Sequence, residues 1–151
     1  LALEILPLVR LEVPHATLRI AGTRPALAVS RLRSEHVEVT GWVDDMPACY
    51  ASARVFVAPI SLGSGMPNKV LQALAMGVAS VSTPEVSGAI EGSEDVLAVG
   101  ATAESVAAHV VDLLRNPAKA RERGEAGRSF AEARFRWDRA TEPLDSMLTR
   151  S

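Results

Sequence analysis

A glycine-rich turn followed by a lysine contains the residues whose types and spacing best fit the binding of a small anion. Gly63 and Gly65 carry no side chain, so the backbone of this turn can approach a ligand closely. A helix is expected to begin at Pro67 or Asn68, and its free amides and positive dipole end attract negative charge. Lys69, in the first turn, adds a full positive charge. The segment therefore predicts a phosphate or diphosphate site; a tight strand-to-helix turn with a solvated lysine is the alternative.

Two common phosphate-binding motifs do not match this turn. A P-loop continues from glycine and lysine to a serine or threonine that reaches magnesium, whereas Asn68, Lys69 and Val70 follow one another here. The dinucleotide-binding fingerprint needs a third glycine where Asn68 stands, and it follows the first strand of its domain, not the third. ATP hydrolysis and nicotinamide binding are therefore disfavoured.

Other side-chain chemistries find little support in the sequence. Ser64 lies in Gly-Ser-Gly and lacks the Gly-x-Ser-x-Gly pattern of a hydrolase nucleophile. The adjacent acids at 44–45 and 94–95 are expected to be solvated or helix-capping groups, and Cys49 a small buried side chain. The three histidines share no metal-binding motif and are interpreted as structural or surface residues. They are His15, His36 and His109.

The composition is that of an ordinary globular domain. The 151 residues suffice for one domain with a core, and 48% hydrophobic with 23% charged residues argues against disorder. Sixteen basic and 18 acidic residues give a net charge of −2, which argues against a general nucleic-acid or membrane binder. One cysteine permits no internal disulfide, as suits a reducing compartment. We therefore expect one soluble, cytoplasmic domain over residues 1–151, without a targeting segment.

The charge is unevenly distributed along the chain. Residues 115–139 contain eight basic and four acidic side chains, a local excess of +4. A solvated helical face is the simpler interpretation, and contact with an anionic membrane or partner is the alternative.

Strands and helices are expected to alternate. Short apolar runs predict five strands, at 17–22, 37–41, 55–59, 78–83 and 96–99. Helical patterns are found at 1–13, 25–34, 45–53, 67–76, 102–115, 117–133 and 137–149. This alternation predicts βαβ units with right-handed crossovers, a parallel sheet with flanking helices, and ligand binding beyond the carboxyl ends of the strands.

The order of several motifs resembles the C-terminal domain of the group 1 retaining glycosyltransferases, which have the GT-B fold. The matching motifs are PHATLRIAG at 14–22, VEVTGWVDDM at 37–46, VFVAPI at 55–60, GSGMPNKVLQALAMG at 63–77 and FRWD at 135–138. They cover nearly the whole chain, and their order is stronger evidence for this family than any single motif. The resemblance implies a Rossmann-like α/β domain, the C-terminal half of a GT-B fold.

The resemblance also implies an activity. The domain would bind a nucleotide-diphosphate sugar as substrate, without a metal or other cofactor, for transfer with retention during glycan synthesis. An N-terminal domain outside this chain would supply the acceptor site, and the full-length protein could make a peripheral membrane contact. Nucleic acid is not an expected partner.

Site residues can be carried over by position in the motifs, although none of them is assigned a catalytic role. Lys69 would support the diphosphate, Val43 would offer backbone contacts to the base, and Gln72 stands where the family has a glutamate that holds the ribose hydroxyls. The turn that would lie against the sugar and phosphates consists of Gly63, Ser64, Gly65 and Met66.

The chain departs from the family pattern at several positions. Ser64 and Gln72 stand where many members have two glutamates, and Gly88 stands where many have the glutamate of Glu-Gly-Leu. An amide at position 72 can still bond two hydroxyls, but without charge assistance. These departures favour the alternative of a degenerate, non-catalytic assembly or regulatory module. Half of a related sugar-nucleotide epimerase is a further alternative.

The family's first strand, which ends in Gly-Arg and leads to a Lys-Gly turn, has no counterpart before Leu1. That strand is central in the fold, so its absence should leave a gap in the sheet with exposed strand edges. We therefore expect this chain to be part of a longer polypeptide, binding nucleotide weakly and transferring nothing by itself.

Overall fold

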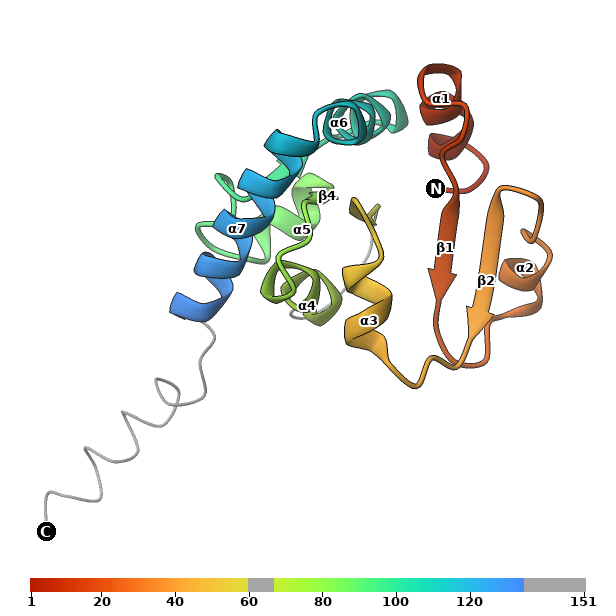
Figure 1. The fold of residues 1–151 in the computed structure, drawn as a ribbon, viewed down its shortest axis with the longest axis horizontal. Helices are drawn as coiled ribbons and strands as arrows, with labels where there is room; N and C mark the ends of the chain where they lie inside the picture. The colour runs from red at the N-terminus through yellow and green to blue at the C-terminus, as the bar shows by residue number, and fades with distance from the viewer. Residues whose placement is uncertain (60–66, 135–151) are drawn as a thin grey trace, which may run out of the picture.

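The computed structural model describes residues 1–59 and 67–134 and shows short parallel strands connected by helices (Figure 1). In chain order the elements are α1 (Ile5–Glu12), β1 (Leu18–Ala21), α2 (Leu27–Ser30), β2 (Val37–Gly41), α3 (Met46–Ala51), β3 (Phe56–Ala58), α4 (Asn68–Ala75), β4 (Ser80–Ser82), α5 (Pro84–Gly88), β5 (Leu97–Val99), α6 (Ala103–Arg115) and α7 (Pro117–Arg134). This alternation confirms the predicted α/β class.

Two helices differ from the sequence-based prediction. The helix expected over 25–34 is shortened to the four residues of α2. None of them is fully buried and Val29 packs only partly against the core, so packing stabilises little helix here. Helix α5 was not predicted; Pro84 occupies its first turn, and Val86 and Ser87 are buried. The helix expected at 137–149 lies outside the described residues.

The five strands form two separate parallel sheets. One is β1–β2, with Leu18 opposite Val37. The other has the order β3–β4–β5. Within residues 1–59 and 67–134, no strand pairs with both β1 and β3. The gap expected from the sequence is therefore present, and it lies between these two strands.

A cavity of about 820 Å³ lies between the two sheets. Leu18 and Ala21 line it from β1, Val57 lines it from β3, and side chains of α1 and α6 line one end. Successive amides of a strand point in opposite directions. The Leu18 amide bonds the carbonyl of His36 on the β2 side, so the amides of Arg19 and Ala21 point away from β2, toward the cavity.

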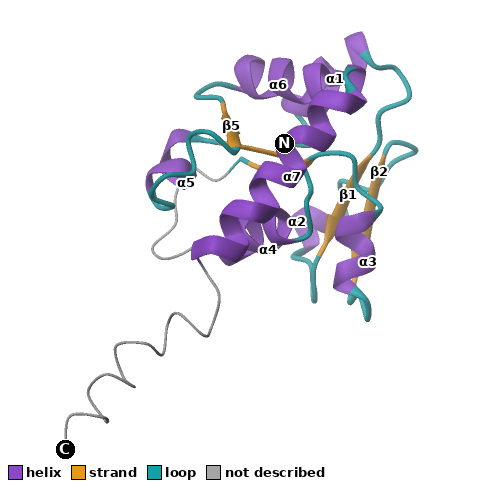
Figure 2. Cartoon of the chain, turned by 60° about the vertical axis from the view of Figure 1, so that its left-hand side comes forward, coloured by secondary structure: helices purple, strands orange, loops and turns teal. Residues whose placement is uncertain are grey.

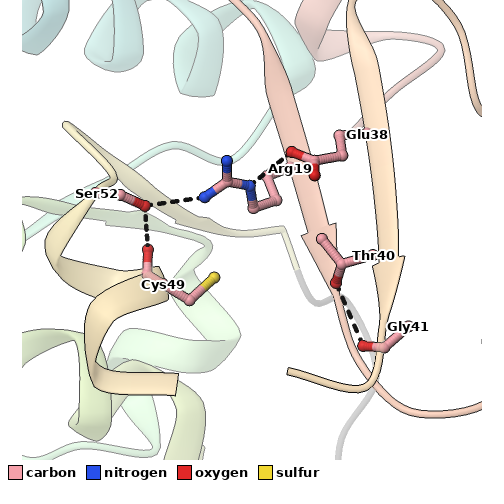
Figure 3. Close-up of polar contacts among 6 residues, drawn as sticks. All are labelled: Arg19, Glu38, Thr40, Gly41, Cys49 and Ser52. Carbon is pink, nitrogen blue, oxygen red and sulfur yellow. Dashed lines mark hydrogen bonds and ion pairs between the residues drawn. The ribbon is translucent and has the colours of Figure 1, made fainter. Parts of the chain in front are cut away.

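A polar contact crosses this gap (Figure 3). Arg19 on β1 donates from Nε to Glu38 Oε2 at 2.7 Å and from Nη1 to Ser52 Oγ at 2.9 Å. Ser52 directly follows α3 and donates in turn to the Cys49 carbonyl at 2.8 Å. Exposed ion pairs of this kind contribute little to stability. The contact nevertheless connects β1 to the residue that follows α3.

Helices cover both faces of the three-stranded sheet (Figure 2). Val81 on β4 faces α6, where it packs with Val106 and Val110, and α1 lies beside α6. The opposite face packs against α4 and α7 through two core residues, Ala58 and Leu97. Because parallel strands are covered on both faces, every β3–β5 side chain is at least partly buried.

The end of α4 packs against α7 at two glycines. Gly77 has a φ of +71°, a left-handed conformation that favours glycine, and it ends α4 with amide bonds from Gly77 to the Leu74 carbonyl and from Val78 to the Ala73 carbonyl. A Cβ at Gly124 of α7 would collide with the Gly77 carbonyl oxygen. Gly124 therefore allows the two backbones to approach closely, and this packing fixes the position of α4.

Replacing Gly124 with alanine is expected to destabilise the protein, because the atom that meets the new methyl group is backbone and cannot rotate away. Gly88→Ala is the matched control, since a Cβ there meets nothing within 4 Å. Both variants gain the higher helix propensity of alanine, so the difference between their free energies of unfolding measures the effect of the collision. We expect Gly124→Ala to be less stable than Gly88→Ala by about 1–3 kcal/mol in urea unfolding. Equal stabilities would contradict this packing.

Candidate functional site

Helix α4 presents two of the predicted site residues on its exposed side. Lys69 lies in its first turn and Gln72 lies three residues later, so the two side chains are neighbours on the helix surface. The opposite side of α4 packs into the core through Val70, Ala73 and Leu74. The amphipathic pattern of the helix therefore directs both polar side chains outward, as a ligand site requires.

Among the described residues, no side chain caps the N-terminus of α4, where the hydrogen bonds are made by backbone groups. The amides of Val70 and Leu71 bond the Pro67 carbonyl at 2.9 and 3.2 Å, and the Pro67 side chain has no acceptor with which to cap the helix. The amides of Asn68 and Lys69 precede this hydrogen-bonding ladder and are oriented toward the end of the helix. An anion there would be attracted by these amides and by the helix dipole.

The other predicted residues of the glycine-rich turn, Gly63, Ser64, Gly65 and Met66, lie outside the described residues. Their placement beside Lys69 remains a prediction from the sequence.

Val43 lies in the loop that connects β2 to α3 and is partly exposed. Its two acidic neighbours stabilise the loop. Asp44 Oδ1 accepts from Trp42 Nε1 at 2.6 Å, and Asp45 Oδ1 accepts from the Ala48 amide at 2.8 Å as the N-cap of α3. Asp45 therefore caps a helix, as the sequence predicted for one of this pair, whereas Asp44 bonds the Trp42 side chain.

Tyr50 connects α3 to the exposed side of α4, and the sequence-based site did not include it. Its hydroxyl lies 3.2 Å from Gln72 Oε1 and 3.4 Å from the Lys69 carbonyl oxygen. The loop that contains Val43 leads into α3, so Tyr50 links this loop to the helix that presents Lys69 and Gln72. A clue was available, because Tyr50 is the only tyrosine in the chain and follows that loop on a predicted helix.

The environment of Tyr50 keeps it protonated. Burial raises the pKa of its phenol, and the nearby Cys49 raises the pKa further. Because the usual pKa of tyrosine is already near 10, the hydroxyl remains a hydrogen-bond donor at neutral pH.

The remaining candidates do not form a second site. His109 Nε2 lies 3.1 Å from the Val99 carbonyl oxygen, as suits a structural histidine. Cys49 is partly exposed on α3, so the expectation of a buried thiol was wrong; α3 is short and only Tyr50 of its residues is buried. Within the described ranges, no three histidine, cysteine or acidic side chains are grouped as a metal site requires.

The group 1 glycosyl transferase family model matches residues 1–116, which is most of the chain. The chain belongs to the group 1 glycosyltransferases. The match includes Val43, Lys69 and Gln72 and ends just after α6. The family therefore extends over both sheets and the candidate site.

Similar proteins occur in mycobacteria. A protein of Mycobacterium tuberculosis named GDP-mannose-dependent alpha-(1-6)-phosphatidylinositol monomannoside mannosyltransferase is 30% identical over 95% of this chain and 42% of its own length. A protein of the same name from Mycolicibacterium smegmatis is 28% identical over 89% of this chain and 40% of its own length. The chain thus spans about two-fifths of these relatives. Among the helices of the described part, none combines the length and apolar character needed to cross a bilayer.

The cap of α3 is expected to contribute measurably to stability, because Asp45 satisfies an amide in the first turn of the helix that carries Tyr50. Asp45→Ala should lower the free energy of unfolding by about 1 kcal/mol. Asp45→Asn retains an acceptor oxygen and serves as the control. Chemical denaturation of the three proteins measures the effect, and an unchanged stability of Asp45→Ala would show that the cap is unimportant.

Proposed function

We propose that this chain is the donor-binding part of a retaining glycosyltransferase that takes its sugar from a nucleoside-diphosphate sugar. The observation that carries the proposal is the exposed pair of Lys69 and Gln72 at the N-terminal half of α4, in a chain of the group 1 glycosyltransferase family. The free amides of α4 and the Lys69 ammonium would bind the diphosphate. Gln72 would bond the ribose hydroxyls, Val43 the base, and residues 63–66 the sugar and phosphates.

The names of the relatives suggest which donor to test first. Both mycobacterial proteins are named for GDP-mannose and for mannosyl transfer to a phosphatidylinositol mannoside. We propose a GDP-sugar as the donor, with GDP-mannose the first candidate. Since charge on the diphosphate would be neutralised by Lys69 and backbone amides, the proposed site needs no metal ion.

The rest of the transferase would lie in polypeptide upstream of Leu1. An acceptor domain there would complete the active site, and a strand there would fill the 820 Å³ cavity and pair with the free edges of β1 and β3. We propose that the chain alone binds donor weakly and transfers no sugar. The full-length protein would act in the cytoplasm and could contact a membrane peripherally.

Calorimetric titration of the full-length protein with GDP, UDP and ADP tests the donor site. Lys69→Ala is expected to weaken binding of the preferred nucleotide about tenfold, since a hydrogen bond to a charged group is lost. The chain offers a matched control in its other lysine, Lys119 on α7, which pairs with Asp112 at 2.6 Å. Lys119→Ala should leave affinity unchanged. Failure of all three nucleotides to bind would refute the proposal.

Hydrogen exchange tests the strand that we propose for the gap. The amides of Arg19 and Ala21 point toward the cavity and should exchange much more slowly in the full-length protein than in the 151-residue chain. The Phe56 amide already bonds the Ala79 carbonyl at 2.9 Å and is the internal control, since its partner is present in both proteins. Equal exchange at Arg19 and Ala21 in the two proteins would exclude a strand at this edge.

A further inference from the structure

Tyr50 has a rigid ring whose hydroxyl reaches the exposed side of α4. The side chain is only 7% exposed and packs with Ala73 and Val78 in a small cluster that also includes Met46 and Phe56. The ring centroids of Tyr50 and Phe56 are 5.7 Å apart, with the planes tilted by 55°. Because the ring is enclosed, the position of its oxygen is set by the packing of α3 against α4.

The hydroxyl of Tyr50 has one hydrogen and two acceptors within reach. The nearer is Gln72 Oε1 at 3.2 Å, and the other is the Lys69 carbonyl oxygen at 3.4 Å, which lies within the α4 backbone. Gln72 is otherwise exposed, and a long exposed side chain samples many rotamers. The bond to Tyr50 restricts this freedom before any ligand arrives.

The bond also determines which end of the amide is available. When Oε1 accepts from the phenol, the two hydrogens on Nε2 remain free to donate. A carboxylate at the same position would be able only to accept. The polarity of the contact offered by Gln72 therefore depends on the Tyr50 hydroxyl. A tyrosine is protonated at neutral pH, and burial raises the pKa of Tyr50 further above its usual value.

We infer that Tyr50 is a positioning residue that orients the Gln72 amide so that Nε2 donates to the ribose hydroxyl oxygens of the donor nucleotide. The inference rests on the proposed function, in which Gln72 lies beside the ribose. It adds a residue that does not itself touch the ligand. It also specifies that Gln72 donates a hydrogen bond to the ribose, where a glutamate could only accept one. Tyr50 lies 22 positions before Gln72 in the sequence and acts on the ligand only through it.

The test compares GDP with 2′,3′-dideoxy-GDP, which lacks both ribose hydroxyls, in calorimetric titrations of the full-length protein. Tyr50→Phe keeps the ring and removes the hydroxyl, and we expect it to weaken GDP binding about two- to tenfold, as loss of an ordinary hydrogen bond does. The same variant should bind the dideoxy nucleotide as the wild type does. In a Gln72→Ala background, Tyr50→Phe should have no further effect on GDP binding.

Met46→Leu is the matched control for packing, because Met46 contacts the same cluster but offers no hydroxyl. It should leave the affinities for both nucleotides unchanged. Nuclear magnetic resonance provides a test that leaves Tyr50 intact: the Gln72 side-chain amide protons, assigned by their loss in Gln72→Ala, should shift when GDP is added and not when dideoxy-GDP is added.

Each other outcome overturns the inference in a recognisable way. A Tyr50→Phe penalty that is equal for both nucleotides, or that persists without Gln72, would mean that Tyr50 acts through packing alone. An unchanged GDP affinity, or amide protons that do not respond to GDP, would mean that Gln72 is not oriented by Tyr50. In these cases the proposed donor site stands, because GDP still binds. If the wild-type protein binds no nucleoside diphosphate, the proposed function fails and this inference fails with it.

Discussion

Parallel pairing of all five strands is the constraint on which the rest of the structure depends. Consecutive parallel strands cannot be joined by a tight turn. Each connection must return from the carboxyl end of one strand to the amino end of the next. The return is helical, and each helix therefore begins near the carboxyl ends of the strands. Helices α3 and α4 follow β2 and β3 in this way. The Val43 loop and Lys69 therefore both lie at the carboxyl ends of the strands. The location of the candidate site follows from the connectivity.

The packing of α4 makes the candidate site at the carboxyl ends of the strands rigid. Its apolar side contacts the sheet, α3 contacts it through Tyr50, and α7 approaches its C-terminal end where two glycine backbones meet. A helix held on three sides can present Lys69 and Gln72 at fixed positions, as tight binding of a ligand requires. The long, strongly charged α7 is therefore explained in part by its contact with α4. The outer face of α7 is exposed.

The gap between β1 and β3 separates the two sheets. Both strands have an unpaired edge toward a cavity lined largely by apolar side chains, and among the described contacts Arg19 supplies a polar connection across it. Natural proteins seldom leave strand edges open toward an apolar space. The gap agrees with the fact that the chain spans about two-fifths of its mycobacterial relatives.

The sequence by itself determined the features that are local along the chain. Apolar runs and turns between them predicted all five strands to within a few residues, and the motif order predicted the glycosyltransferase family and the gap. Local sequence signals were weaker where burial decides the outcome: α2 is short and has no fully buried side chain, whereas α5 forms where Val86 and Ser87 enter the core. Only the tertiary structure decided the contacts of Tyr50 with Gln72 and of Arg19 with Ser52. These pairs are 22 and 33 residues apart, and no periodicity or capping rule reaches so far, because such contacts depend on how helices and strands pack in space.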